Sequence, residues 1–240
     1  MDRTGEDRFF WREGRGASDY SGEILGSTPE HARARTSYLW DYNHDDKHTT
    51  FEVSKVFELR RDAAVLFTTW TFKNTGEQQV FLTPWVKHLG GRTGKRLSGP
   101  TVMLGEGGLF EPSGFLEATT DWMARLSGRD TTTELPMVVS TMDYAQIFQQ
   151  FPWGGTGVSD KPERFTLETI LNRVELAPQE EWSITYALSV GPNLGNPLYA
   201  APELAAELVL PEEATPGKTC QMTARLSPFL KLGAKRLEGE

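Results

Sequence analysis

Cysteine and histidine are scarce in this chain of 240 residues, which contains one Cys and four His. The single Cys220 excludes an intramolecular disulfide, and no neighbouring Cys or His completes a zinc-binding set. We expect Cys220 to be a small, half-buried residue of a strand. Any mechanism that uses an imidazole must draw on His31, His44, His48 or His88.

Long apolar runs and a surplus of positive charge are also missing. No stretch reaches the about 18 consecutive apolar residues that a membrane-spanning helix needs. The first residues lack the apolar core of a secretory signal, which fits a cytoplasmic protein and equally a secreted protein whose signal was removed. The 25 Lys and Arg are outnumbered by 33 Asp and Glu, for a net charge of -8. Because phosphate binding needs a concentrated basic face, we expect neither nucleic acid nor a membrane as partner.

Turn-forming residues, in contrast, are plentiful. The chain has 23 Gly and 14 Pro, which are spread between short apolar runs. With 38% hydrophobic and 24% charged residues, the composition excludes a disordered chain, a collagen and a coiled coil. The length suffices for one domain over 1–240 with a large core. Within it, 1–36 is expected to be irregular or to form an edge strand, and 230–240 to be a solvated tail.

Period-2 alternation of apolar and polar residues indicates β-strands along most of the chain. Residues 51–60 and 64–74 predict two strands joined by a turn at Arg61-Asp62, and 79–89 predicts a third, which would complete a meander. Pro84 should place that third run at an edge or a bulge. Further strand-like runs are 121–127, 135–141, 144–151, 164–171, 181–190 and 218–226. Only 202–208 favours a short helix.

This spacing of strands, with hardly any helical pattern between them, predicts the fold class. Strands that recur every 8–15 residues are typical of antiparallel sheets and argue against βαβ units. We therefore predict an all-β protein, an antiparallel β-sandwich with one or two short helices.

The segment 41–48 carries two of the four histidines. In a β conformation His44, Asp46 and His48 would share one face, and two imidazoles with a carboxylate can bind a divalent metal. The segment is so polar that a solvated loop explains it equally well. We expect no metal or other cofactor and keep these three residues as weak candidates.

His88 and Glu168 are the candidates for acid–base chemistry. His88 ends an apolar run just before Gly90-Gly91 and a basic loop with Arg92, where an imidazole can meet solvent and ligand. The alternative is a ring that only hydrogen-bonds a carbonyl. Glu168 lies in a strand-like run and should share a face with Thr166 and Ile170, where a partly desolvated carboxylate suits a general base.

The alternative for Glu168 is the solvated face of an amphipathic strand, with Arg164 and Arg173 close enough to pair with it.

A third group of residues suits a sugar. Gln146, Gln149 and Gln150 precede Trp153, and aromatic faces stack on the C–H face of a pyranose while amides bind its hydroxyls. The chain has 7 Trp, most of which would also fit a hydrophobic core. The expected partner is a sugar or a sugar-derived small molecule.

Several of these segments together resemble the galactose mutarotase-like (aldose 1-epimerase-like) supersandwich superfamily. The similarity is carried by Leu167-Glu168-Thr169, by Val174-Glu175-Leu176-Ala177-Pro178 and by Glu181-Trp182. Upstream, 71–91 is similar to the family's "v.NtG..pl.l....H" meander and 121–148 to its central strands. The resemblance covers roughly residues 50–191.

The resemblance implies a sugar isomerase or epimerase in which Glu168 is the base on the anomeric hydroxyl and His88 the acid. The residues then expected to bind the substrate are Lys87, Arg92, Gln149, Trp153 and Arg164. The family's N-H-x-Y-F context is replaced here by residues 85–89, and no histidine follows His88.

That departure leaves two other interpretations open. One is a non-catalytic carbohydrate-binding or accessory domain. The other is a polysaccharide lyase-like enzyme that would use Tyr42, Tyr144, Arg92 and His88, with the basic loop 92–96 receiving an acidic sugar. Whether the chain is an enzyme, and its oligomeric state, do not follow from the sequence.

Overall fold

The alternating pattern of the sequence produces long antiparallel strands, because every second side chain faces the same side of a sheet. The structure is a computed structural model, and it describes residues 17–44, 47–61, 63–90, 101–105, 108–110, 116–117, 122–125, 137–153, 165–190, 197–200, 204–209 and 216–228. The predicted fold class, an antiparallel β-sandwich, is confirmed.

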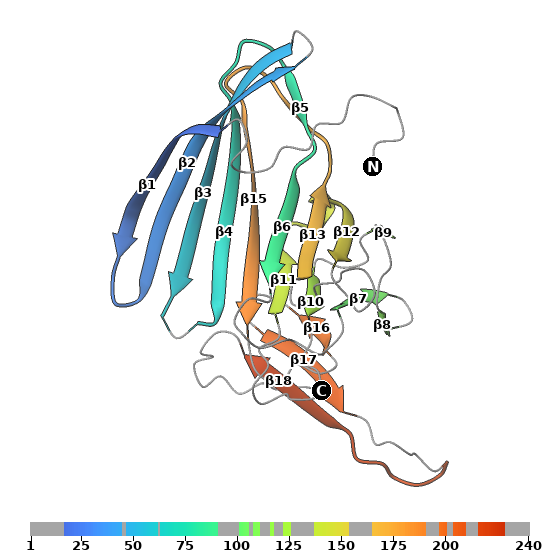
Figure 1. Ribbon diagram of the computed structural model, residues 1–240. Helices are drawn as coiled ribbons and strands as arrows, with labels where there is room; N and C mark the ends of the chain where they lie inside the picture. Colours follow the sequence, from blue (N-terminus) through green and yellow to red (C-terminus); the bar gives the residue numbers. More distant parts are fainter. Residues whose placement is uncertain are drawn as a thin grey trace.

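The large sheet has nine strands in the order β1-β2-β3-β4-β15-β11-β10-β7-β8. Their bounds are β1 Ala17–Ser27, β2 His31–His44, β3 Lys47–Arg60, β4 Val65–Asn74, β7 Thr101–Gly105, β8 Gly108–Phe110, β10 Trp122–Arg125, β11 Met137–Thr141 and β15 Glu181–Val190. The central strand β15 pairs with β11 and with β4, and β4 and β15 lie side by side although they are more than a hundred residues apart in sequence. Figure 1 shows β1 to β4 and β15 as one row of long strands.

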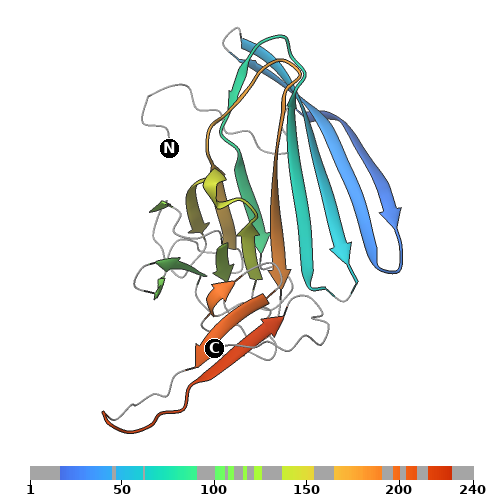
Figure 2. The ribbon, with the colours of Figure 1, turned by 180° about the vertical axis from the view of Figure 1, so that it is seen from behind.

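The small sheet has four strands in the order β6-β13-β12-β9. They are β6 Trp85–Gly90, β9 Leu116–Glu117, β12 Ile147–Trp153 and β13 Phe165–Leu171, with a short 3-10 helix η1 at Tyr144–Gln146 just before β12. The small sheet lies beside β15 and β11, and β1 to β3 extend away from it, as both views show (Figures 1 and 2).

The core lies where the two sheets face each other. One cluster joins Leu167 of β13 to Met123, Met137 and Val139 of the large sheet. A second joins Val86 of β6 and Leu171 of β13 to Ile184 and Tyr186 of β15. We call the face of the small sheet that makes these contacts its inner face, and the opposite side its outer face.

Two further sheets complete the described fold. β5 Val80–Leu82 pairs with β14 Val174–Leu176, and Leu176 packs in a cluster with Tyr38, Phe51, Val53 and Phe72 of the large sheet. β16 Pro197–Ala200, β17 Leu204–Val209 and β18 Thr223–Pro228 form a three-stranded sheet beyond the end of β15 (Figure 1).

Pro84 divides the third run of the predicted meander. The run forms two short strands, β5 and β6, which pair with β14 and β13 rather than with β4. Proline cannot donate a backbone hydrogen bond, and here the Pro84 carbonyl accepts one from the Leu171 amide at 2.9 Å. The predicted meander is therefore wrong beyond its first two strands, because β6 belongs to the small sheet.

Three other expectations need correction. Residues 204–208, expected in a short helix, belong to strand β17, because pairing with β16 and β18 on both sides outweighs a weak helical propensity. The described residues contain no α-helix, and no helix among them is long and apolar enough to span a membrane. Of the alternatives for 1–36, residues 17–27 form an edge strand. Cys220 is exposed and precedes β18.

Candidate functional site

The register between β6 and β13 decides which candidate side chains meet. Glu168 lies opposite Lys87, and Leu167 lies opposite His88. Directly opposed residues of an antiparallel pair share a face, and neighbouring residues on one strand point to opposite faces. Glu168 and Lys87 are therefore on the outer face of the small sheet, and His88 is on the inner face with Leu167.

Glu168 and Lys87 form an ion pair on that outer face. The Lys87 Nζ atom lies 2.8 Å from Glu168 Oε1, and the Glu168 side chain is only 4% exposed whereas that of Lys87 is 48% exposed. The carboxylate is thus held in a nearly dry position by an ammonium group that reaches solvent. Such a pair places a proton acceptor directly beside a charged donor.

Two more polar or aromatic residues belong to the same face. Ile170, which shares the face of Glu168, lies opposite Trp85 on β6 and opposite Gln149 on β12. Trp85 is 36% exposed and Ile170 6% exposed. We call Trp85, Lys87, Gln149, Glu168 and Ile170 the outer-face patch. Its residues on β6 are partly exposed to solvent, and its residues on β13 are buried.

Strand spacing sets the size of this patch. Adjacent strands lie about 4.8 Å apart, and residues two apart on a strand are separated by about 6.6 Å. Trp85 and Gln149 are therefore about two strand spacings apart. Lys87 lies two residues from Trp85 in β6, and Glu168 lies two residues from Ile170 in β13.

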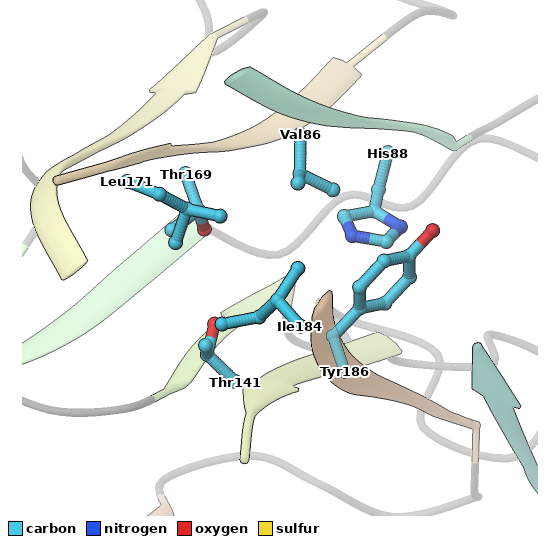
Figure 3. Close-up of a pocket in the computed structure, with 7 residues that line it drawn as sticks. All are labelled: Val86, His88, Thr141, Thr169, Leu171, Ile184 and Tyr186. Atoms are coloured by element: carbon cyan, nitrogen blue, oxygen red, sulfur yellow. The ribbon is translucent and has the colours of Figure 1, made fainter. Parts of the chain in front are cut away.

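His88 points into the interior of the sandwich. Its ring packs edge-on against Tyr186, with 4.5 Å between ring centroids, and its buried Nε2 atom has no hydrogen-bond partner. Figure 3 shows the ring at a small cavity that is also lined by Val86, Thr169, Thr141 and other side chains of both sheets. The cavity has room for about one water molecule.

Burial also changes the protonation of His88. Desolvation lowers the pKa of the imidazole to about 4, so the ring is neutral near pH 7. The expected pair of Glu168 as base and His88 as acid in one site is thus corrected by the geometry, because the two side chains lie on opposite faces of the small sheet.

The segment expected to bind a metal is a hairpin rather than one strand. β2 ends at His44 and β3 begins at Lys47, with His44 opposite Lys47 and His48 opposite Asn43. The two histidines therefore occupy ladder positions of opposite parity, which removes the shared face that a single strand would provide. Asp46 lies outside the described residues. Within the part of the chain that the structure describes, no group of three His, Cys, Asp or Glu residues could hold a metal ion.

Other expected site residues are placed only in part. Arg92 and Arg164 lie outside the described residues. For Trp153 the structure describes the backbone, which pairs with Thr166, two residues before Glu168 in β13. Arg173 does not pair with Glu168, since its guanidinium lies 4.2 Å from the Phe81 ring centroid. Of the expected substrate-binding residues, Lys87 and Gln149 therefore fall on the face of Glu168.

Sequence reasoning missed Trp85. Its only signal was its spacing of two residues from Lys87, which places both on one face of a strand. The spacing places Trp85 beside Glu168 only because β6 pairs with β13, and the sequence does not show this pairing.

Comparisons with known proteins agree with this fold. The Slr1438 protein from Synechocystis sp. PCC 6803 matches at a TM-score of 0.50 with 14% identity, over 72% of this chain and 66% of that chain. A galactose mutarotase related enzyme from Lactobacillus acidophilus matches at 0.48 with 11% identity, over 75% and 73%. A galactose mutarotase-like protein from Lactobacillus casei matches at 0.45 with 9% identity, over 72% and 74%.

Galactose mutarotase-like proteins are thus among the structural neighbours. At these identities the likeness concerns the fold alone, and the chain spans about two thirds of the Slr1438 protein. No protein-family model and no curated protein sequence matches the chain.

Proposed function

We propose that this chain is a carbohydrate-active isomerase of the aldose 1-epimerase type, with its site on the outer-face patch. The observation that carries the proposal is the Glu168–Lys87 ion pair, in which a buried carboxylate is held by a half-exposed ammonium. The patch adds a partly exposed indole and an amide on the same face, which are groups that bind sugars.

The reaction needs one base and one acid. Glu168 takes the proton of the anomeric hydroxyl while the bond between C1 and the ring oxygen breaks, and Lys87 gives a proton to that oxygen. The product is the open-chain aldehyde. After rotation about C1–C2, the hydroxyl attacks C1 from the other face, Lys87 recovers its proton and Glu168 returns its own. No proton is gained or lost over the cycle.

The position of the pair suits this role. Because Glu168 is buried, it is poorly solvated by water, and a hydrogen bond from a sugar hydroxyl to its carboxylate is stronger than at an open surface. Lys87 is 48% exposed and touches the carboxylate, so its ammonium is placed beside the proton acceptor. Trp85 would orient the sugar by stacking on its C–H face.

The test is the exchange rate between the α and β anomers of D-glucose and D-galactose, measured by NMR saturation transfer. Glu168→Gln keeps the shape of the side chain and removes its basicity, so we expect the catalysed rate to fall about 10²- to 10⁴-fold. Glu175→Gln, on the exposed part of β14, is the matched control and should retain the wild-type rate. Unchanged exchange in Glu168→Gln would end this proposal.

A second candidate is a non-catalytic carbohydrate-binding domain. It is favoured by the inward position of His88, which leaves no imidazole on the face of Glu168 among the described residues. This candidate predicts sugar binding with an anomeric exchange rate equal to that of buffer. The two candidates thus differ in one measurement, since both require binding and only the isomerase accelerates exchange.

A further inference from the structure

We propose that the side of β1 facing away from β2, here called the β1 edge, binds the β1 edge of a second copy of this chain, so that two large sheets become one. β1 is the first strand of the large sheet, whereas the small sheet with the outer-face patch lies beside β15 and β11 (Figures 1 and 2). The interface is therefore separate from the proposed sugar site, and this inference does not depend on the proposed function.

The β1 edge is open to pairing in the part of the chain that the structure describes. There, β2 is the one strand that pairs with β1. The outer side of an edge strand presents backbone N–H and C=O groups to another strand, and many proteins prevent such pairing with a short edge strand, a lysine or a proline. β1 is 11 residues long and contains neither lysine nor proline. Its backbone is thus suited to binding another strand.

Two large apolar side chains of β1 lie on one face of the sheet and are exposed. The Tyr20 ring lies 5.2 Å from the Tyr38 ring, measured between centroids, and Tyr38 belongs to the core cluster of that face. Ile24 lies opposite Ala34, four residues from Tyr38 in β2 and so on the same face. We call this the core-side face of the large sheet. Tyr20 is 56% exposed and Ile24 75% exposed, so a single chain leaves both of them in contact with water.

The regular part of β1 is short. Its register with β2 shifts between Ser18 and Ser21, where Asp19 has a φ angle of 53°, and shifts again between Ile24 and Gly26. Such irregularities interrupt strand pairing, so a second β1 can pair over about residues 20–24. A junction of this length buries less than the about 1,200 Å² of a typical stable interface. We therefore expect a dimer that forms at micromolar concentrations.

The sequence of this regular part is self-complementary. A two-fold axis normal to the sheet keeps the core-side faces of both copies on the same side, and an axis at Gly22 places Tyr20 of each copy opposite Ile24 of the other. Opposed aromatic and β-branched side chains stabilise an antiparallel pair. Because the two members of the pair lie on one strand, the same surface serves both copies, as in other two-fold dimers. This symmetry favours a second copy of the chain over a different partner.

Other positions of the axis are less favourable. An axis at Glu23 would oppose the two Glu23 carboxylates, and an axis at Ser21 would oppose Asp19 and Glu23. Like charges directly opposite each other destabilise a strand pair. An axis at Tyr20 or at Ile24 would extend the pairing into one of the two irregular ends. The central position therefore fits the charges and the regular part of the strand best.

Gly22 and Gly26 offer matched positions for a test. A Cβ atom at Gly22 would lie 3.9 Å from the Arg35 carbonyl oxygen, an ordinary contact, and a Cβ atom at Gly26 would have no atom within 4 Å. Neither glycine has a left-handed φ. A side chain can therefore be added at either position without disturbing the single chain. Glycine inside a strand often marks a close approach of another backbone, which suits Gly22 at the axis.

The first experiment is cross-linking of the full chain under mild oxidation, with the exposed Cys220 replaced by serine. In Gly22→Cys the two thiols would face each other across the axis, on Cα atoms about 4.5–5.5 Å apart, which permits a disulfide. In Gly26→Cys they would be about eight residues apart along the junction, or about 26 Å. We expect a covalent dimer in Gly22→Cys and none in Gly26→Cys.

The second experiment is sedimentation velocity over a series of protein concentrations. The wild type should change from monomer to dimer as its concentration rises. Ile24→Asp removes both apolar pairs and adds negative charge to an acidic strand, so the dissociation constant should rise about tenfold or more. Leu59→Asp is the control, because Leu59 is 51% exposed on β3, two strands from the edge, and it should keep the wild-type constant.

Three results would overturn the inference. One is a wild type that stays monomeric at every concentration, which would leave the β1 edge unused or assign it to another protein. Another is equal cross-linking of Gly22→Cys and Gly26→Cys, which indicates random collisions. The third is a Leu59→Asp variant that dissociates as readily as Ile24→Asp. Because both aspartate variants change exposed side chains, circular dichroism should show them to be folded like the wild type.

Discussion

The two faces of the small sheet have different properties although they are made by the same two strands. On the inner face, Leu167 is fully buried in a hydrophobic cluster and His88 packs on Tyr186. On the outer face, at the neighbouring position of each strand, Glu168 pairs with Lys87. Neighbouring residues of one strand thus have different roles: one packs in the core and the next is polar. The face to which a residue points decides its role.

This contrast shows why a polar residue in a strand is a poor guide to a site by itself. His88 and Lys87 are neighbours in β6, yet the imidazole points into the interior with a buried Nε2 atom while the ammonium reaches solvent. The inner face should therefore respond to substitution with a loss of stability, and the outer face with a loss of ligand binding or turnover.

The largest loss of stability is expected for Leu167→Ala. Its side chain is 0% exposed, and truncation of a fully buried leucine costs about 2–5 kcal/mol of unfolding free energy. Glu168→Gln, one residue away, should cost about 1 kcal/mol or less, because its ion-pair partner is half exposed. Urea unfolding of both variants checks the difference, and equal losses would remove the distinction between the faces.

Acid should destabilise the protein through His88. Its pKa is lowered from 6.5 in the unfolded chain to about 4 in the fold, so the unfolded state binds the extra proton first. Stability is therefore full above about pH 6.5, falls as the pH is lowered, and levels off near pH 4, for a total of about 3 kcal/mol.

Between about pH 4 and 6.5, the range bounded by these two pKa values, His88 contributes to the pH dependence of the unfolding free energy. His88→Gln should flatten the dependence of unfolding free energy on pH in this window, relative to the wild type, in urea titrations at pH 7, 6 and 5. A curve of the same slope in both proteins would contradict an inward, uncharged imidazole.

Trp85→Ala should have the smallest effect on stability, about 1 kcal/mol or less, because the ring is 36% exposed. Loss of its stacking surface should weaken sugar binding about 3- to 10-fold. Phe81→Ala is the control, since Phe81 is 54% exposed on β5 and packs with Arg173 away from the patch. Calorimetric titration with D-galactose compares the two, and equal affinities would place the sugar elsewhere.

Much of the fold was predictable because it depends on local alternation. The runs that became β3, β4, β13 and β15 show a period of two, and so their strand character followed from the side chains alone. Pairing between distant strands has no such local signal. The helix expected over 202–208 failed for this reason, since two neighbouring strands impose the extended form on β17.

The site was predictable only in its parts. Parity within β13 correctly placed Glu168 with Ile170, but parity alone does not say which residues of β6 lie opposite. A shift of one residue in register would have brought His88 to the face of Glu168. Lys87 and Gln149 were expected from the sequence as sugar-binding residues, and their position beside Glu168 became visible only with the register of β6, β12 and β13.

We propose that proton transfer takes place on the outer face of the small sheet and not at His88. This claim is tested most directly by anomeric exchange of D-galactose in Lys87→Met and His88→Gln at pH 7, where both proteins are first shown to be folded. We predict that Lys87→Met loses about 10²- to 10⁴-fold of the catalysed rate and that His88→Gln stays within about threefold of the wild type. The reverse result, with His88→Gln inactive and Lys87→Met active, would contradict the claim.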